Sequence, residues 1–234
     1  MRQIKNSSIS CKDKLIKSHN FLVKQQSPYF FIPSQTLNSM EKVLVIVAHP
    51  DDETIWMGGS LIKNCVIEKD WKVEIISLCR KNDAERAEKF FKVCSFLNAK
   101  GFISDLDDSE DGSYKEITPE DITARLKKFI NGGYDIIFTH GENGEYGHKR
   151  HIEVHNAVKG LLKSGELRVK KAFFFSYAIK GGILEINSSA DNLINLDKNI
   201  YSRKKFIIHK IYGFDKGSFE EKCCGKKEAF ELLK

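Results

Sequence analysis

From residue 42 onward the chain alternates short apolar runs with amphipathic helical patterns, and this alternation restricts its fold more than any other feature. The apolar runs predict strands and the patterns between them predict helices: strands at 42–48, 72–79, 134–139 and 172–177, and helices at about 54–68, 83–98, 119–131 and 150–163. Strands that alternate with helices pair side by side in parallel. The sequence therefore predicts an α/β fold with a parallel sheet.

The chain has 234 residues, of which 41% are hydrophobic and 30% charged, enough for one large domain with a small appendage. We expect a domain over residues 42–234. Residues 1–41 form a polar, lysine-rich N-terminal extension with apolar patches at 21–23 and 29–32, which we expect to dock on this core. Beyond Gly181 and Gly182 the periodic pattern weakens.

Composition and charge exclude several classes of protein. No apolar run approaches the roughly 18 residues that cross a bilayer, and no apolar signal core follows the first residues, so we expect a soluble, cytoplasmic protein without a transmembrane segment. The six cysteines include no C-x-x-C pair and are expected to be free thiols. The net charge of +6 is spread along the chain without a basic cluster among aromatics, so no nucleic-acid partner is expected.

The first predicted strand runs directly into His49-Pro50-Asp51-Asp52-Glu53. In open α/β sheets, ligands bind beyond the carboxyl ends of the strands, where this turn lies. The turn contains no glycine before Gly58, which disfavours a nucleotide phosphate cradle. One imidazole and three carboxylates instead suit a divalent metal of the zinc type. The alternative is that Asp51 or Asp52 only caps the following helix.

A second group of polar residues follows the predicted strand 134–139. Four of the seven histidines fall within sixteen residues there: His140, His148, His151 and His155. If a helix begins near His148, the last three lie on one face of it. Two strand ends with ligand-type side chains are therefore expected to converge on one ion.

The motifs A-H-P-D-D-E and G-x-Y-G-H-x-x-H-x-x-x-H, each at a strand end, resemble the LmbE-like family of zinc-dependent deacetylases, which includes the N-acetylglucosaminyl-phosphatidylinositol de-N-acetylases. The resemblance covers roughly residues 42 to 180. It implies a Rossmann-like three-layer sandwich with a mostly parallel sheet and the site at the carboxyl strand ends. It also implies one catalytic Zn²⁺, with Fe²⁺ as another possible metal, and removal of an acetyl group from an N-acetylglucosamine-type sugar in a glycoconjugate. The alternatives are a zinc hydrolase of another amide or ester, and a non-catalytic sugar-binding relative.

The resemblance also assigns roles to residues of this chain. It implies the following: zinc ligands His49, Asp52 and His151; a general base, Asp51; and an oxyanion-stabilising His148 that helps to protonate the leaving amine. Three protein ligands leave an open metal position, as a catalytic zinc requires. For that reason His155 is expected to be structural or to support a ligand.

Substrate contacts are implied for Tyr146 at the mouth of the site and for Arg86, which would grip sugar hydroxyls. An acidic substrate contact is also expected, and we take Asp108 for it, although three other residues compete: Asp105, Asp107 and Asp111.

The sequence departs from the family pattern at two places. Lys149 and Arg150 replace a common Pro-Asp pair, and this exchange of a carboxylate for two cations favours an anionic sugar conjugate. His209 is followed by Lys-Ile-Tyr where the family often has H-x-S-Q, so no role is assigned to it. The sequence leaves the oligomeric state open.

Overall fold

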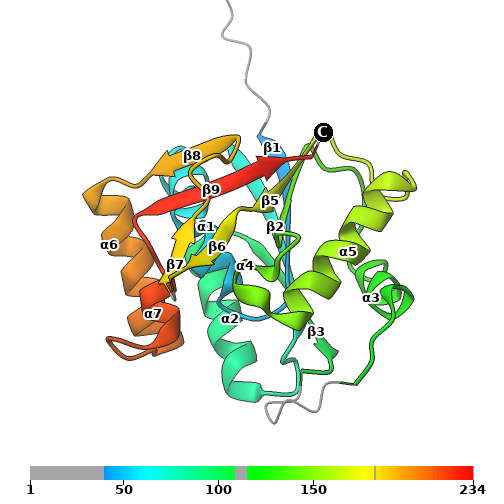
Figure 1. Cartoon of the computed structure of the whole chain (residues 1–234), viewed down its shortest axis with the longest axis horizontal. Coiled ribbons are helices and arrows are strands. Elements are labelled where there is room, and N and C mark those ends of the chain that lie inside the picture. Colours follow the sequence, from blue (N-terminus) through cyan, green and yellow to red (C-terminus); the bar gives the residue numbers. More distant parts are fainter. Residues whose placement is uncertain (1–39, 109–114, 182, 234) are drawn as a thin grey trace, which may run out of the picture. The chain divides into compact units, whose positions relative to one another are not determined.

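The computed structural model describes residues 40–108, 115–181 and 183–233. Within them, a seven-stranded sheet has the order β3-β2-β1-β4-β5-β9-β8 (Figure 1). Its strands are β1 (Glu41–Val47), β2 (Trp71–Cys79), β3 (Lys100–Leu106), β4 (Ile136–Thr139), β5 (Lys171–Phe175), β8 (Asn192–Asn195) and β9 (Lys227–Leu232). The strands β1 to β5 pair in parallel, whereas β9 runs antiparallel to β5 and β8 antiparallel to β9. The predicted mostly parallel α/β sheet is confirmed.

Helices cover both faces of the sheet, which explains why residues 43–47 of β1 are apolar without alternation and fully buried. Val43, Val45 and Val47 lie in a core with residues of three helices: α1 (Asp52–Leu61), α2 (Ala84–Phe96) and α6 (Lys198–Phe206). Leu44 and Ile46 face a second core with residues of α3 (Pro119–Leu126) and α5 (Lys149–Lys163). The fold is therefore the expected three-layer sandwich (Figure 1).

The strand order reverses between β1 and β4. The chain moves outward from β1 through β2 to β3, and β4 then pairs on the other side of β1, with Ile46 beside Thr139. A crevice for ligands forms at such a switch point, outside the carboxyl ends of the two strands. His49 and His140 follow these two strand ends, so the topology brings both histidine-containing segments to one place.

Several elements differ from the sequence-based expectation. The strand β3 and the strands after β5 lie where no element was predicted, and the helix expected over 119–131 ends at Leu126. The expected helix 54–68 begins at Asp52, bends at Met57 and continues as a π-helical segment, η1 (Ile62–Ile67). The remaining elements are α4 (Gly144–Gly147), β6 (Tyr177–Lys180), β7 (Ile183–Ile186), η2 (Ile207–Tyr212) and α7 (Phe219–Cys223).

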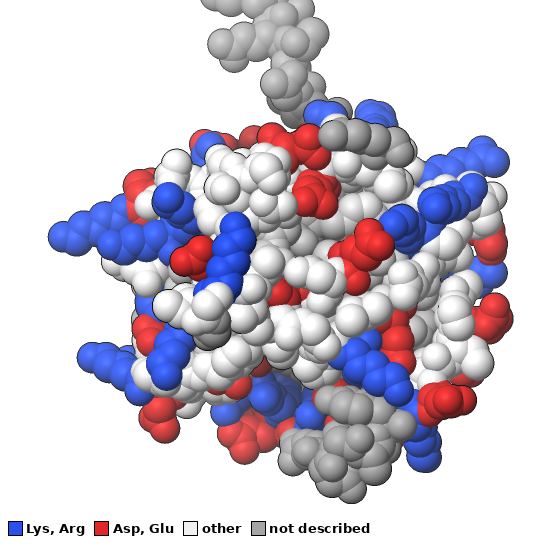
Figure 2. Space-filling view, viewed as in Figure 1, with Lys and Arg blue, Asp and Glu red and all other residues white. Residues whose placement is uncertain are grey.

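Other expectations concern the surface and the cysteines. The five cysteines of the described part are free and buried, as predicted. Figure 2 shows basic and acidic side chains interspersed over the viewed face, in agreement with a mixed, solvated surface. None of the helices in the described ranges is both long enough and apolar enough to span a bilayer. The predicted docking of residues 1–41 and the candidate Asp111 lie outside the described residues, apart from positions 40 and 41.

A buried ion pair holds the bend in α1. Met57 has non-helical angles (φ −144°, ψ 16°), so the helix needs new partners for the N–H groups that follow the bend. The Glu228 carboxylate of β9 accepts hydrogen bonds from the N–H groups of Gly59 (2.7 Å) and Ser60 (2.9 Å). The Lys204 ammonium of α6 lies 2.7 Å from the same carboxylate, and both charged side chains are fully buried. The second half of α1 is thus anchored by two elements from the C-terminal part of the chain.

We expect Glu228→Ala to lower the free energy of unfolding by about 3–5 kcal/mol, because it leaves the Lys204 charge buried without its partner. Urea denaturation followed by circular dichroism measures the loss. Glu231→Ala, an exposed carboxylate of the same strand, is the matched control and should cost well under half as much. Equal losses in the two variants would contradict the anchoring role of Glu228.

Candidate metal centre and active site

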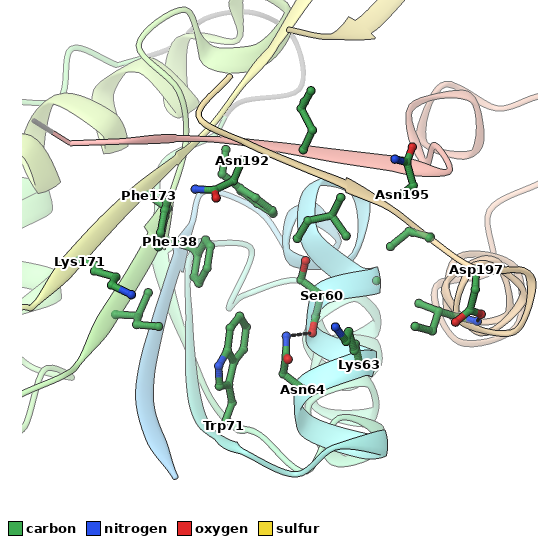
Figure 3. Close-up of a pocket in the computed structure, with 17 residues that line it drawn as sticks. Ser60, Lys63, Asn64, Trp71, Phe138, Lys171, Phe173, Asn192, Asn195 and Asp197 are labelled. Atoms are coloured by element: carbon green, nitrogen blue, oxygen red, sulfur yellow. Dashed lines mark hydrogen bonds between the residues drawn. The ribbon is translucent and has the colours of Figure 1, made fainter. Parts of the chain in front are cut away.

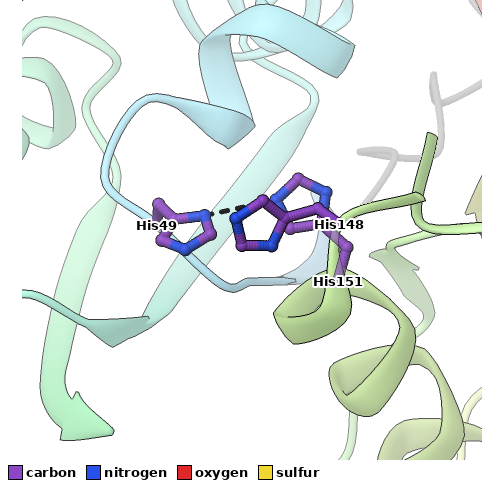
Figure 4. A group of neighbouring side chains, drawn as sticks. All are labelled: His49, His148 and His151. Atoms are coloured by element: carbon purple, nitrogen blue, oxygen red, sulfur yellow. Dashed lines mark hydrogen bonds between the residues drawn. The ribbon is translucent and has the colours of Figure 1, made fainter. Parts of the chain in front are cut away.

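Three side chains from the two strand ends form a compact triangle of ligand atoms. His49 Nδ1 lies 3.2 Å from His151 Nε2 and 3.2 Å from Asp52 Oδ2, and the latter two atoms are 3.4 Å apart. Bonds of about 2.0–2.1 Å to a tetrahedral ion place its ligand atoms roughly 3.3–3.4 Å from one another. The three atoms therefore already lie at the spacing of one face of a tetrahedral metal site. Figure 4 shows two of these rings, together with His148.

The carboxylates that face the outer nitrogens of the two rings indicate which nitrogen atoms carry protons. His151 Nδ1 lies 2.6 Å from Glu145 Oε2, and His49 Nε2 lies 3.3 Å from Asp108 Oδ2. These carboxylates favour protons on the outer nitrogens, which leaves lone pairs on His151 Nε2 and His49 Nδ1. Two lone pairs and a carboxylate oxygen then face one another. Such a set repels itself without a cation, so the donor chemistry fits a divalent ion of the zinc type.

In the turn after β1, neither aspartate uses its side chain to cap helix α1. Asp52 Oδ2 accepts the N–H of His49 (2.8 Å), and Asp52 Oδ1 accepts the indole N–H of Trp56 (3.0 Å). Asp51 occupies the N-cap position of α1, but its side chain makes no capping hydrogen bond. Its carboxylate instead lies 2.7 Å from the Arg86 guanidinium. The capping alternative is wrong for both residues.

Glu53, the third carboxylate of the motif, points into the core. It is fully buried and accepts hydrogen bonds from Tyr212 OH (2.8 Å), Thr54 Oγ1 (2.6 Å) and the N–H of Asp51 (3.1 Å). Asp51 has a φ of 116°, a conformation that is strained for a non-glycine residue. Glu53 therefore supports the strained backbone from which Asp51 projects.

Asp51 is a buried carboxylate beside the triangle formed by the ligand atoms of His49, Asp52 and His151. Burial raises the pKa of Asp51 to about 7, and the neighbouring Asp52 acts in the same direction, while Arg86 opposes both. The Arg86 guanidinium also lies 5.0 Å from the centre of the Phe214 ring, which orients it. Arg86 thus contacts the predicted base directly.

Two members of the triangle, His49 and Asp52, line a cavity of about 150 Å³, and His151 lies behind them, fully buried. The side chains that line it include most of the predicted site: His49, Asp51, Asp52, Arg86, Asp108, Tyr146 and His148, with Ile55, Trp56, Arg80, Phe219 and Glu220. Tyr146 is half-buried, and its ring centre lies 4.9 Å from that of Phe219 and 6.3 Å from that of Trp56. The mouth of the cavity therefore has an aromatic wall.

His148 lies next to the triangle and, with His49 and His151, forms a group of three imidazoles that could also hold an ion (Figure 4). Its ring centre is 4.6 Å from that of His151 and 4.7 Å from that of His49. Burial, with the nearby His151 and His49, lowers the pKa of His148 to about 4, so the ring is neutral near pH 7. Its Nδ1 accepts the N–H of Arg150 (3.2 Å), which leaves the proton of the neutral ring on Nε2. His148 therefore presents a hydrogen-bond donor.

Sequence reasoning did not identify Glu145 and gave His140 no specific role. The fully buried Glu145 carboxylate binds the Nδ1 atoms of both His151 (2.6 Å) and His140 (2.9 Å) and accepts the N–H of Gly141 (2.7 Å). His140, Asp52 and His151 form another group whose ligand atoms lie close enough to hold an ion. However, His140 Nε2 accepts the N–H of Ala48 (2.9 Å), so its lone pair is already used. We infer that Glu145 and His140 support the ligands from behind.

The described acidic residues at the end of β3 and just after it, which are candidates for a substrate contact, each pair with a different arginine. Asp105 pairs with Arg125, and Asp107 with Arg150. Of the candidates that the structure describes, Asp108 is the one that lines the cavity. Its Oδ2 lies 2.7 Å from Arg80 Nη2 and 3.3 Å from His49 Nε2. Although burial opposes the shift, His49 and Arg80 hold the pKa of Asp108 below its usual range, so it supports a ligand as well as bordering the cavity.

The expectation that Arg150 attracts an anionic substrate group is wrong. Its side chain is fully buried, and its guanidinium donates to the Asp107 carbonyl oxygen (2.6 Å) and to the Glu153 carboxylate (2.5 Å). An arginine neutralised in this way in the interior does not steer a ligand. Lys149 is half-exposed, with its ammonium 3.9 Å from Glu153.

Two further histidines lie apart from the triangle. His155 is buried, and its Nδ1 donates to the carbonyl oxygen of His140 (2.9 Å), which secures the end of β4. This contact agrees with the expected supporting position. His209 Nδ1 bonds with the carbonyl oxygen of Phe214 (2.8 Å), and its side chain does not line the cavity.

Comparison with known proteins gives a family match and several distant relatives. The model of the family described as PIG-L, GlcNAc-PI de-N-acetylase, matches residues 44–162, which include both histidine-containing segments. An uncharacterized protein of Acanthamoeba polyphaga mimivirus, L374, is 26% identical over 178 residues, covering 71% of this chain and 77% of that protein. The 1D-myo-inositol 2-acetamido-2-deoxy-alpha-D-glucopyranoside deacetylase of Corynebacterium diphtheriae is 25% identical over 157 residues, and the match spans 54% of each protein.

Solved structures share the fold at low sequence identity. GalB, the 4-carboxy-2-hydroxymuconate hydratase of Pseudomonas putida, has a TM-score of 0.60 and 13% identity, with 83% of this chain and 96% of that chain covered. The N,N'-diacetylchitobiose deacetylase of Pyrococcus horikoshii has a TM-score of 0.56 and 16% identity, with coverages of 82% and 84%. A hydratase and a deacetylase thus share this fold, so the side chains of the site must decide the reaction.

We expect Glu145→Gln to weaken metal affinity about 10- to 100-fold, because a neutral amide orients and polarises His151 less well than a carboxylate. Titration of the metal-free protein with Zn²⁺ in competition with a chromophoric chelator measures the change. Glu142→Gln is the matched control, since that carboxylate lies in the loop just before α4 and is 82% exposed. Unchanged affinity in the Glu145 variant would contradict the supporting role.

Proposed function

Because the chain belongs to the PIG-L family of deacetylases, we propose that it is a zinc-dependent enzyme that removes the acetyl group from an N-acetylglucosamine-type sugar in a glycoconjugate. The observation that carries this proposal is the convergence of His49 Nδ1, Asp52 Oδ2 and His151 Nε2 beside a cavity that Asp51 and His148 line. The side chains proposed as ligands, base and oxyanion partner thus lie close together.

The proposed reaction divides the work among these side chains. His49, Asp52 and His151 would hold the ion, and a bound Zn²⁺ supplies Lewis acidity and a more acidic water. Asp51 does not cap its helix, so its carboxylate is available to take a proton from the attacking water. His148, with its proton on Nε2, would donate a hydrogen bond to the oxyanion that develops from the amide carbonyl and help to protonate the leaving amine.

Recognition of the substrate is proposed for the rim of the cavity. The rings of Tyr146 and Phe219 offer apolar faces on which a sugar ring can pack. Arg86 lies at the same rim and could reach sugar hydroxyls, provided that it keeps its ion pair with Asp51. Two similar proteins, the deacetylases of Corynebacterium diphtheriae and Pyrococcus horikoshii, are both named for acetylated amino sugars, which supports this substrate class.

We expect the purified protein to hold about one zinc ion per chain, in line with three protein ligands and an open position. His151→Ala should lose the metal and the deacetylase activity together, as measured by elemental analysis and free-amine detection. His209→Ala, which removes an imidazole outside the cavity, is the control and should retain the ion. Full zinc occupancy in the His151 variant would contradict the ligand set, and reconstitution with Fe²⁺ compares the two candidate metals.

We expect Asp51→Asn to keep the metal and to slow hydrolysis by about 100-fold or more, because it removes the proton acceptor. Free amine released from a panel of N-acetylglucosamine conjugates measures the rate, and simple amides and esters in the same panel test the alternative hydrolase activities. Asp105→Asn changes a carboxylate outside the cavity and should leave the rate within about twofold. Near-normal turnover of the Asp51 variant would exclude its role as the base.

A further inference from the structure

A second and larger cavity, of about 490 Å³, lies between the sheet, the α1–η1 segment and β8 (Figure 3). Trp71, Ile136 and Lys171, the first residues of β2, β4 and β5, line it. The cavity therefore opens at the amino ends of the parallel strands, whereas the triangle of ligand atoms lies at their carboxyl ends. The two cavities share no lining residue among those that the structure describes.

Aromatic rings from four strands form the floor of this cavity. The Phe138 ring centre lies 5.1 Å from that of Phe173, with the planes stacked at 18°, and 5.6 Å from that of Trp71. The Phe230 ring packs edge-on against Phe138 at 5.2 Å. Apolar side chains of the β8 segment, among them Ile194 and Leu196, face this floor. Apolar cavities of roughly 300–1,000 Å³ with a few polar groups are typical of small-molecule sites.

Polar and basic side chains surround the apolar floor. Lys171 lies on the same strand face as Phe173, because alternate residues of β5 point the same way. Lys63 of η1 also lines the cavity, and its ammonium makes only a half-exposed contact of 3.6 Å with Glu68. Asp197 is the acidic lining residue, but its carboxylate caps α6 through the N–H of Ile200 (2.9 Å). Asn64 lies beside Lys63, where its amide donates to the carbonyl oxygen of Ser60 (2.8 Å), and Asn192 lines the cavity from β8 (Figure 3).

We propose that this cavity binds a small aromatic anion, such as an aromatic carboxylate or sulfonate, at a site separate from the metal centre. The stacked rings would receive the aromatic body by offset or edge-on packing. Lys63 and Lys171 would attract its negative charge, and the Asn192 amide would donate a hydrogen bond to one of its oxygens. This proposal goes beyond the proposed deacetylase function and does not depend on it.

The test compares two fluorescent probes with the same rings and different charge. The sulfonate probe 8-anilinonaphthalene-1-sulfonate and its neutral counterpart N-phenyl-1-naphthylamine are titrated into the full chain. We expect one sulfonate probe per chain, with a blue-shifted emission. The double variant Lys63→Gln with Lys171→Gln should weaken binding of the sulfonate probe about fivefold, which is the scale of two exposed charge contacts. Binding of the neutral probe should not change.

Two further variants make the result specific to this cavity. Asn192→Trp places an indole at the rim of the cavity and should weaken the binding of both probes. Lys128→Gln removes an exposed charge outside the cavity and should leave the binding of both probes unchanged. Far-ultraviolet circular dichroism confirms that each variant is folded. The proposal would be overturned by several probes per chain, by unchanged binding in the Asn192 variant, or by a lysine effect of equal size on both probes.

Discussion

One electrostatic constraint determines how the side chains are arranged at the carboxyl ends of the parallel strands. Three atoms that accept protons, His49 Nδ1, Asp52 Oδ2 and His151 Nε2, lie within 3.4 Å of one another. A cation relieves the repulsion among these atoms, and contacts to the other polar atoms of the same side chains keep them oriented. Glu145 bonds His151, Trp56 bonds Asp52, and Asp108 lies 3.3 Å from His49 Nε2.

Backbone strain accompanies this arrangement. Asp51 (φ 116°) and Glu145 (φ 59°) both adopt left-handed conformations that cost free energy in a non-glycine residue. Each is held by hydrogen bonds to buried groups: Glu53 bonds the N–H of Asp51, while the Glu145 carboxylate bonds Gly141 and two histidines. The strain therefore occurs where a side chain must project from a turn into the site, and the surrounding packing balances its cost.

The two cavities lie at opposite ends of the parallel strands, and helix α1 extends from one cavity to the other. This helix begins with Asp52, one of the three proposed ligands, and reaches the aromatic cavity at Gly59 and Ser60. Between them it bends at Met57, and Glu228 from β9 anchors the part beyond the bend. Because a hydratase shares the same fold, the sheet and helices alone do not choose the chemistry. The choice depends on the side chains that the strand ends bring together.

The sequence by itself determined the α/β class, the edge of the sheet that bears the site and the convergence of the two histidine-containing segments. These features follow from local periodicity and from the rule that parallel strands place their carboxyl ends together. The strands β8 and β9 gave no such signal, because they are short and largely exposed at their ends and their partners are distant in the chain. Nothing in the spacing separated Glu145 from Glu142, or showed that Arg150 turns inward to Asp107 and Glu153. Only the tertiary structure decided these points, because the direction in which a charged side chain points depends on the buried partner that it meets across the fold.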